Sequence, residues 1–303
     1  MSEAELVLDA RNATGESPVW RVGEQALYWV DIPARTLCRW TSATAQLSTW
    51  QAPEMLACIA PTATNSWLAG AESGVFELQP HADGQLGFKR LARVSHAAKG
   101  MRFNDGRCDR QGRLLAGTML MNMAAAARIG CIYRYEGGSS KNGDDAGQLS
   151  KLVDGFITPN GMAFSPDGRT MYLSDSHPSV QLIWAFDYDT GTGTPSNRRV
   201  FVNMNPLPGR PDGAAVDADG CYWICANDAG LVHRFTPAGK LDRSLSVPVR
   251  KPAMCAFGGA GLDTLFVTSI RPDGIDLTDQ PLAGGVFALR PGVRGLPETS
   301  FLV

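Results

Sequence analysis

The stretch ITPNGMAFSPDGRTMYLSD, residues 157–175, contains the pattern that decides the fold. Asn160 is followed by a glycine and a short apolar run, and a Pro-Asp-Gly turn at residues 166–168 leads into a second apolar run that ends at Asp175. Gly168 accepts a positive φ at little cost, so two strands joined by this turn are expected to form a hairpin. The stretch therefore predicts an antiparallel strand pair with a polar residue where its first strand begins.

Similar units recur along the whole chain. Their openings lie at Glu16, Ile59, Asn104, Asn160, Asp212 and Cys255, separated by 43, 45, 56, 52 and 43 residues. A period of about 40 to 50 residues with several short strands per unit is typical of a β-propeller. We therefore predict an all-β, six-bladed β-propeller that forms a single domain over residues 1–303. A strand near residues 5–9 is expected to complete the last blade beside residues 285–289, because an open sheet edge would otherwise remain.

Composition narrows the class of protein. The chain has 303 residues, of which 44% are hydrophobic and 19% charged, and a net charge of −2, so we expect a globular protein without a nucleic-acid or membrane partner. Its first eight residues lack the features of a signal peptide, and no apolar run approaches the roughly 20 residues that span a bilayer. Seven cysteines without a Cys-x-x-Cys pair indicate free thiols in a reducing compartment, hence a cytoplasmic location. We expect a monomer or a weak homodimer.

Polar residues recur at the openings of the units. The first strand of each propeller blade lines the central channel, so Glu16, Arg102, Asn104, Asp105, Asn160 and Asp212 are expected to meet at one end of it. Glu16, Asn160 and Asp212 offer oxygen donors from three blades, which suits a hard divalent cation such as Ca²⁺, Mg²⁺ or Mn²⁺, with Zn²⁺ or Fe²⁺ as alternatives. Three protein ligands leave positions open for water and substrate. A catalytic metal site in the central channel is therefore expected.

A simpler interpretation treats these residues as turn formers. Asn160-Gly161 and Asp212-Gly213 are common turn dipeptides, and either alone favours that interpretation. The same offset recurs at residues 104–106, and a proline precedes both Asn160 and Asp212, which favours a site. The other aspartates at strand ends, Asp31, Asp175, Asp217 and Asp219, are expected to cap backbone groups. No two histidines stand at a metal-binding spacing.

Five short motifs carry a resemblance to a known family. Residues 15–20 (GESPVW), 102–106 (RFNDG), 158–161 (TPNG), 211–213 (PDG) and 257–259 (FGG) together resemble the gluconolactonase/regucalcin (senescence marker protein) family of sugar lactonases. The resemblance implies a six-bladed propeller with one divalent cation in its channel, held by Glu16, Asn160 and Asp212. It also implies that Arg102 and Asn104 contact the substrate. Some members have a substrate-contacting Glu after a Gly-Thr-Met element; this chain has Met121 and Asn122 there, so Asn122 is a candidate contact and recognition of the sugar is expected to differ.

The function expected from these residues is metal-dependent hydrolysis of a sugar lactone, an aldonolactone or an aldarolactone, to the free sugar acid in carbohydrate metabolism. The cation would polarise the lactone carbonyl, and Asp212 would accept a proton from water as the general base. Asp105 would support Asn104 or bind a further hydroxyl. Two alternatives remain open: a phosphotriester or aromatic-lactone hydrolase on the same fold, and a Ca²⁺-binding or scaffold propeller without catalysis.

Overall fold

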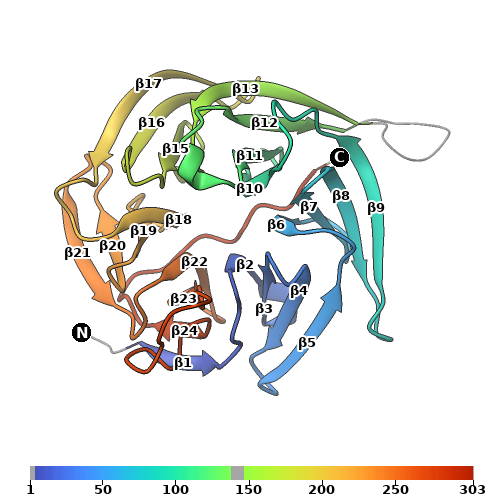
Figure 1. The fold of residues 1–303 in the computed structure, drawn as a ribbon, viewed down its shortest axis with the longest axis vertical. Helices are drawn as coiled ribbons and strands as arrows, with labels where there is room; N and C mark the ends of the chain where they lie inside the picture. The colour runs from blue at the N-terminus through green and yellow to red at the C-terminus, as the bar shows by residue number, and fades with distance from the viewer. Residues whose placement is uncertain (1–3, 138–146, 303) are drawn as a thin grey trace.

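The strands form a ring of six sheets around a central axis (Figure 1). The computed structural model describes residues 4–137 and 147–302, so most of the Gly-, Ser- and Asp-rich stretch that follows the third strand of the third unit lies outside the described residues. In these two ranges the chain forms 24 strands arranged as six four-stranded sheets. The predicted all-β, six-bladed propeller is confirmed. Within the described ranges no helix is long and apolar enough to cross a membrane.

The first three blades follow the chain from the inside of the ring outward. The first contains β2 (Gly15–Arg21), the 3₁₀ turn η1 (Val22–Glu24), β3 (Ala26–Asp31), β4 (Thr36–Thr41) and β5 (Gln46–Gln51). The second contains β6 (Leu56–Pro61), β7 (Trp67–Ala71), β8 (Gly74–Pro80) and β9 (Leu86–Arg93). The third contains β10 (Met101–Cys108), β11 (Leu114–Leu120), the 3₁₀ turn η2 (Met123–Ala125), β12 (Gly130–Glu136) and β13 (Gln148–Phe156).

The remaining blades complete the ring. The fourth contains β14 (Pro159–Phe164), β15 (Thr170–Asp175), β16 (Leu182–Asp189) and β17 (Thr194–Asn203). The fifth contains β18 (Arg210–Val216), β19 (Tyr222–Asn227), β20 (Leu231–Phe235) and β21 (Leu241–Ser246). The sixth contains β22 (Pro252–Gly258), β23 (Thr264–Ser269), β24 (Val286–Leu289) and, outermost, β1 (Glu5–Leu8). Because β1 pairs Glu5 with Ala288 and Leu8 with Val286, the N-terminal strand covers the edge of the last sheet.

Apolar side chains between neighbouring blades hold the ring together. Six clusters of buried hydrophobic residues each join one blade to the next. Between the first and second blades, for example, the rings of Tyr28 and Trp67 lie 4.5 Å apart. All seven cysteines are buried and unpaired, as the sequence predicted, and five of them belong to these clusters. The inner strands are thereby fixed relative to one another.

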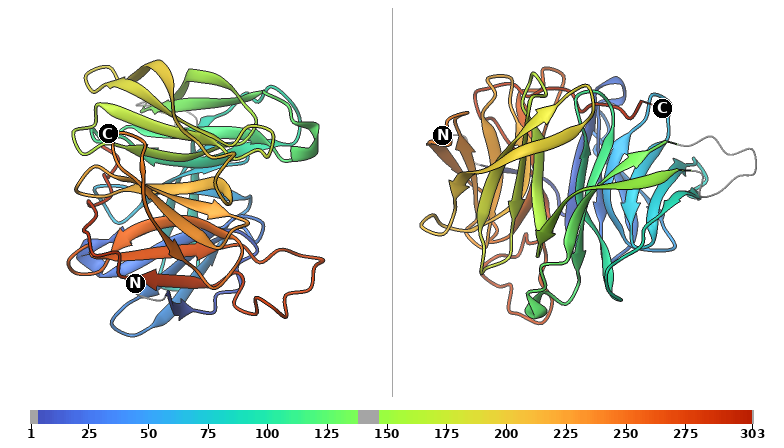
Figure 2. Two further views of the ribbon diagram at one scale, coloured as in Figure 1. Left: turned by 90° about the vertical axis from the view of Figure 1, so that its left-hand side faces the viewer. Right: turned by 90° about the horizontal axis from the view of Figure 1, so that it is seen from above.

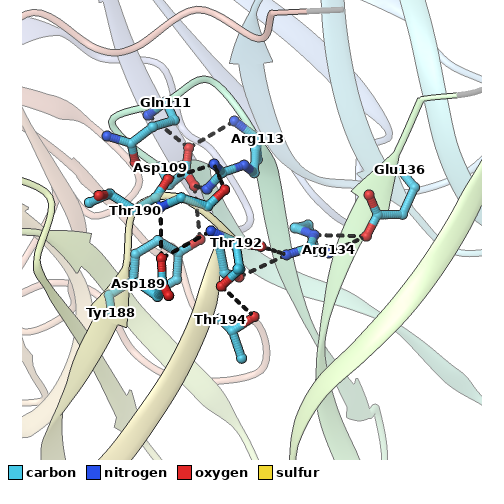
Figure 3. Close-up of polar contacts among 12 residues, drawn as sticks. Asp109, Gln111, Arg113, Arg134, Glu136, Tyr188, Asp189, Thr190, Thr192 and Thr194 are labelled. Atoms are coloured by element: carbon cyan, nitrogen blue, oxygen red, sulfur yellow. Dashed lines mark hydrogen bonds and ion pairs between the residues drawn. The ribbon is translucent and has the colours of Figure 1, made fainter.

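Polar contacts at the turns add to the link between the third and fourth blades (Figure 3). Asp109, after β10, accepts hydrogen bonds from Arg113 Nη1 and from the Tyr188 hydroxyl, both at 2.8 Å. Arg113 Nη2 also donates to the carbonyl of Thr190 at 2.6 Å. The turn of one blade thus binds the outer hairpin of the next with buried, charge-assisted hydrogen bonds.

The C-terminal segment, residues 290–302, crosses one mouth of the ring. Ala218 N donates to the carbonyl of Arg294, Phe301 N to that of Pro61 and Leu302 N to that of Gly112, at 2.8, 2.7 and 3.0 Å. In the right-hand view of Figure 2 this end of the chain lies at the top, and the green turn containing η2 projects at the bottom. The segment therefore lies at the opposite end of the ring from η2.

Candidate active site

The predicted site residues lie near the beginnings of four inner strands. Glu16 lies on β2, Asn104 on β10, Asn160 on β14 and Asp212 on β18. Each of these strands has a register shift in its pairing next to that residue, and a shift occurs near the start of β6 and β22 as well. A β-bulge bends a strand and turns a side chain away from the regular alternation. The repeated bulge, rather than chance, directs the polar side chains of separate blades to one level of the ring.

A chain of hydrogen bonds joins four of the predicted residues across three blades. Arg102 Nη1 donates to Asn104 Oδ1 at 2.8 Å. Asn104 Nδ2 donates to Asn160 Oδ1 at 2.9 Å, and Asn160 Nδ2 donates to Asp212 Oδ1 at 2.9 Å. Asn104, Asn160 and Asp212 are all buried, so each of these bonds lies largely out of water. The structure therefore brings together residues that are separated by up to 110 positions in the sequence.

The second oxygen of Asp212 is held from within its own blade. Asn227, the last residue of β19, donates from Nδ2 to Asp212 Oδ2 at 2.6 Å, and Arg210 Nη2 donates to Asn227 Oδ1 at 3.3 Å. Sequence reasoning missed both residues. Asn227 stands in a polar Asn-Asp-Ala-Gly turn, which gives no sign of function, and Arg210 gives only the weak signal of a charge two residues before Asp212.

Asp105 lies in the same channel but has a different partner from the one expected. Its Oδ2 accepts a hydrogen bond from the backbone N–H of Met162 on β14 at 2.7 Å, and no hydrogen bond joins it to Asn104 among the described residues. Its Oδ1 is buried without a hydrogen-bond partner in the described chain. Asp105 thus links the third blade to the fourth and presents one unsatisfied carboxylate oxygen.

Burial and like charge act on the acidic groups of this site. Burial, together with the negative charges of Asp212 and Asp105, raises the pKa of Glu16 well above its usual range. Burial also raises the pKa of Asp105 and of Asp212; Arg107 opposes the first shift, and Arg210 and Asn227 oppose the second. Three carboxyl groups therefore lie within electrostatic range in a region that disfavours their negative charge.

Arg102, the cationic side chain of the predicted set, lies in the same buried environment. Burial lowers the pKa of Arg102 to about 10, and the negative charge of Glu16 opposes this shift. Its hydrogen bonds in the described chain all leave from Nη1, to Phe103 O at 2.7 Å and to Asn104. The other edge of its guanidinium group makes no hydrogen bond to described residues and is available to a ligand.

These residues fit a divalent cation. No three His, Cys, Asp or Glu side chains in the described ranges are grouped closely enough to hold a metal by themselves, but the expected set of Glu16, Asn160 and Asp212 includes an amide. Carboxylate and amide oxygens have two lone pairs each, so Asn160 Oδ1 and Asp212 can accept their present hydrogen bonds and still bind a cation. A cation would relieve the repulsion among the buried carboxylates and suit the unsatisfied oxygen of Asp105.

Asn122 stands apart from the hydrogen-bonded network. It is exposed, directly precedes η2 and makes no side-chain hydrogen bond to that turn. The turn itself is tied to the fourth blade, where the ring of His177 contacts the carbonyl of Met123 at 3.2 Å. Asn122 therefore lies beside η2, and no hydrogen bond among the described residues joins it to Arg102 or Asn104.

Three of the four expected cap residues have the role that the sequence predicted, and Asp217 accepts from the N–H groups of Asp219 and Cys221. The expectation was wrong for Asp219, whose carboxylate accepts from Arg234 Nη2 at 3.0 Å and from no backbone N–H of the described residues. Asp31 accepts hydrogen bonds from the backbone N–H groups of Ala13 and Thr14, and Asp175 from those of Ile157 and Thr158. Each aspartate thereby fixes the segment that leads into β2 or β14. The capping aspartates position the site from behind and are not part of it.

Comparison with known proteins agrees with the resemblance seen in the sequence. The region described as SMP-30/Gluconolactonase/LRE-like matches residues 14–271. A 6-deoxy-6-sulfogluconolactonase of Pseudomonas putida is 39% identical over 290 residues, covering 95% of this chain and 94% of that protein. Human regucalcin is 34% identical over 302 residues, covering 98% and 97%.

A solved structure extends this agreement to three dimensions. The calcium-binding protein regucalcin from Agrobacterium tumefaciens superimposes with a TM-score of 0.89 and 27% sequence identity, covering 100% of this chain and 98% of that one. The whole described ring therefore corresponds to a known architecture.

Proposed function

This chain belongs to the SMP-30/gluconolactonase/LRE-like family, and from that premise we propose that it is a lactonase that opens a sugar lactone with the help of one divalent cation. The observation that carries the proposal is the hydrogen-bonded series from Arg102 through Asn104 and Asn160 to Asp212, with Glu16 in electrostatic range. A scaffold protein has no need of five polar side chains converging at the inner strands. A hydrolase that must bind a polar ring and activate water needs such a set of side chains.

Glu16, Asn160 and Asp212 would hold the cation. When bound, the cation would act as a Lewis acid that polarises the lactone carbonyl and stabilises the negative charge developing on the carbonyl oxygen. This stabilisation is worth several kcal/mol in the transition state. One relative points to calcium, since the Agrobacterium tumefaciens regucalcin is described as a calcium-binding protein. Ca²⁺, with its preference for oxygen ligands and open coordination positions, suits two carboxylates and one amide.

Asp212 acts as the general base. One of its carboxylate oxygens accepts the proton of the attacking water, and the protonated carboxyl group later returns it to the ring oxygen as the ester bond breaks. The hydrogen bonds from Asn160 and Asn227 keep the group in one orientation while it accepts the proton.

Arg102 supplies the polar recognition of the ring. Its free guanidinium edge suits hydroxyl groups or an anionic substituent through forked hydrogen bonds. Asn104 uses both amide hydrogens within the protein, on Pro159 O and Asn160, so it orients Arg102 and Asn160 and has one lone pair left for a substrate hydroxyl. The candidate substrates are a gluconolactone and, from the name of the Pseudomonas putida relative, its 6-deoxy-6-sulfo derivative.

A panel of substrates and cations tests this function. Purified protein treated with EDTA is assayed with γ- and δ-aldonolactones, 6-deoxy-6-sulfogluconolactone, dihydrocoumarin and a phosphotriester, each with Ca²⁺, Zn²⁺, Mn²⁺, Mg²⁺ or Fe²⁺ restored. We expect cation-dependent hydrolysis of the sugar lactones above that of the aromatic lactone and the phosphotriester. Preference for either of the latter would indicate the alternative hydrolase, and cation binding without hydrolysis of any substrate would indicate a binding propeller.

A further inference from the structure

A second row of hydrogen bonds lies behind Asp212, on the side away from Asn160. Asp228 Oδ2 accepts from Arg210 Nε at 2.6 Å, Arg210 Nη2 donates to Asn227 Oδ1 at 3.3 Å, and Asn227 Nδ2 donates to Asp212 Oδ2 at 2.6 Å. All four residues belong to the fifth blade or the turn that follows β19. The four residues of this row therefore come from one blade, whereas the other oxygen of Asp212 accepts from Asn160 of the fourth blade.

Burial and further contacts hold Asn227, Arg210 and Asp228 in place. Asn227 is buried, with 1% of its surface exposed, and its Nδ2 also lies 3.4 Å from the carbonyl of Pro252 in the sixth blade. Arg210 donates from Nη1 to the carbonyl of Ser176 in the fourth blade at 3.2 Å, and Lys251 forms an ion pair with Asp228. Asp228 has φ +75°, a conformation that costs a non-glycine residue energy and persists only where surrounding contacts enforce it.

We propose that Asn227, fixed by Arg210, is the positioning residue that sets the orientation of the Asp212 carboxylate. A carboxylate held at one oxygen can rotate about its Cβ–Cγ bond, whereas one held at both oxygens by donors from different blades cannot. Asn227 supplies the second of these donors, and Arg210 fixes which end of the Asn227 amide faces Asp212, because a guanidinium group donates only to the amide oxygen. This inference rests on the proposed function of Asp212.

The orientation matters because Asp212 has two tasks in that function. It would ligate the cation and accept the proton of the attacking water, and both require its oxygens in fixed directions. Partners that orient a metal ligand change cation affinity, commonly by about 10- to 100-fold when they are removed. Asn227 is therefore expected to affect both cation binding and the rate of the chemical step, although it contacts neither substrate nor water in the proposed scheme.

Two variants of Asn227 separate orientation from simple packing. Asn227→Asp has the same shape but replaces the donor with an acceptor, and Asn227→Ala removes the side chain. We expect kcat at saturating cation to fall on the order of 10- to 100-fold in both, with KM changed by less than about threefold. Arg210→Lys keeps the positive charge but loses the forked geometry, so it should reproduce part of the fall.

Cation binding is the second readout and does not depend on turnover. Isothermal titration with Ca²⁺ alone should show a Kd raised about tenfold in both Asn227 variants. Ser269→Ala is the matched control, since it removes a buried hydrogen bond, to the Gly285 carbonyl, at the corresponding strand end of the next blade. We expect its kcat and Ca²⁺ affinity to equal those of the wild type.

The outcomes distinguish this inference from the proposed function. Circular dichroism first establishes that each variant is folded. If folded Asn227→Asp and Asn227→Ala retain kcat and Ca²⁺ affinity within twofold of the wild type, Asn227 has only a structural role and the inference is wrong. If the wild type binds Ca²⁺ but hydrolyses no lactone, the proposed function fails, while the Ca²⁺ affinities of the same variants still decide whether Asn227 positions Asp212.

Discussion

Asp212 has hydrogen-bond donors on both carboxylate oxygens, a raised pKa and a neighbouring negative charge from Asp105. We predict that Asp212→Asn, which keeps the shape of the side chain, lowers kcat by about 10² to 10⁴ because the general base is lost. The new amide nitrogen would face the Nδ2 donor of Asn160 or Asn227, so circular dichroism first establishes that the variant is folded. Steady-state kinetics with a sugar lactone measures the effect, and a variant with kcat near that of the wild type would exclude Asp212 as the base.

His233 offers a test of buried polar groups away from the site. It is buried on β20, its ring contacts Ser244 Oγ at 2.7 Å and the Pro208 carbonyl at 3.0 Å, and burial lowers its pKa below 6.5. The folded state thus favours the neutral ring, so its contribution to stability is complete above pH 6.5 and is lost as the pH falls from 6.5 toward the lowered pKa.

The prediction is a pH-dependent difference between wild type and His233→Gln. Their difference in Tm should be largest above pH 7 and should shrink as the pH falls below about 6.5, the usual histidine value. Thermal denaturation followed by circular dichroism from pH 5 to 8 provides the measurement. A difference that stays constant over this range would show that the lowered pKa of His233 makes no contribution.

Glu16, Asn104, Asn160 and Asp212 occupy corresponding openings of the repeated units, so comparing units reveals them. Arg210 precedes Asp212 by the same two positions as Arg102 precedes Asn104, and Asn227 ends β19 as Asp175 ends β15, but neither position shows which group the side chain contacts. Only the folded blade shows that a residue 15 positions after Asp212 reaches its carboxylate. Asp105 was predicted as a site residue, but its bond to Met162 N required the register of two blades.

Among the elements, β1 alone is far in sequence from the sheet it completes. It pairs with β24 and leaves no long unpaired edge on the sixth blade. The sequence predicted this strand from the need to close the ring. The sequence did not predict the inner-strand bulges, because they depend on the register between paired strands. The 3₁₀ turn η2, which follows β11, is short. β11 continues to Leu120, and Ala126 adopts a left-handed conformation with φ +46° that ends the turn.

Removing β1 should therefore weaken the whole ring. A chain that starts at Ala10 loses the strand and exposes the edge of β24, so we expect its Tm to fall by at least several degrees and its tendency to self-associate to rise. Calorimetry and size-exclusion chromatography measure the two effects. A chain that starts at Ala4 keeps β1 whole and serves as the control. Equal Tm values for the two chains would contradict a stabilising role for this closure.

In the whole molecule, the ring of six blades follows from the repeated sequence units, because each blade packs apolar faces against its two neighbours. The course of residues 290–302 across one mouth was not predicted, since the segment belongs to no repeat. It is fastened by single contacts to several blades, including an ion pair between Glu298 and Arg107. The site residues lie at the other end of the ring, near η2, since Arg102 pairs with Met119 close to the end of β11.

A cation bound between blades should stabilise the ring as a unit. We predict that Ca²⁺ at about 100 times its Kd adds about 2.7 kcal/mol to the free energy of unfolding, since it binds only the folded state. The rise in Tm should be absent in Glu16→Ala and Asp212→Ala, which lack an expected ligand. Differential scanning calorimetry with and without Ca²⁺ measures it, and equal rises in all three proteins would place the bound cation elsewhere.

In the proposed function, Glu16, Asn160 and Asp212 hold a cation that lactone hydrolysis requires. The most direct measurement is the initial rate of glucono-δ-lactone hydrolysis by EDTA-treated wild type and Glu16→Ala, before and after Ca²⁺ or another divalent cation is restored, corrected for spontaneous hydrolysis. We predict that the wild type is inactive after EDTA and recovers with the cation, whereas folded Glu16→Ala stays at least about 100-fold less active. Full activity of the wild type in EDTA, or full recovery of Glu16→Ala, would contradict the account.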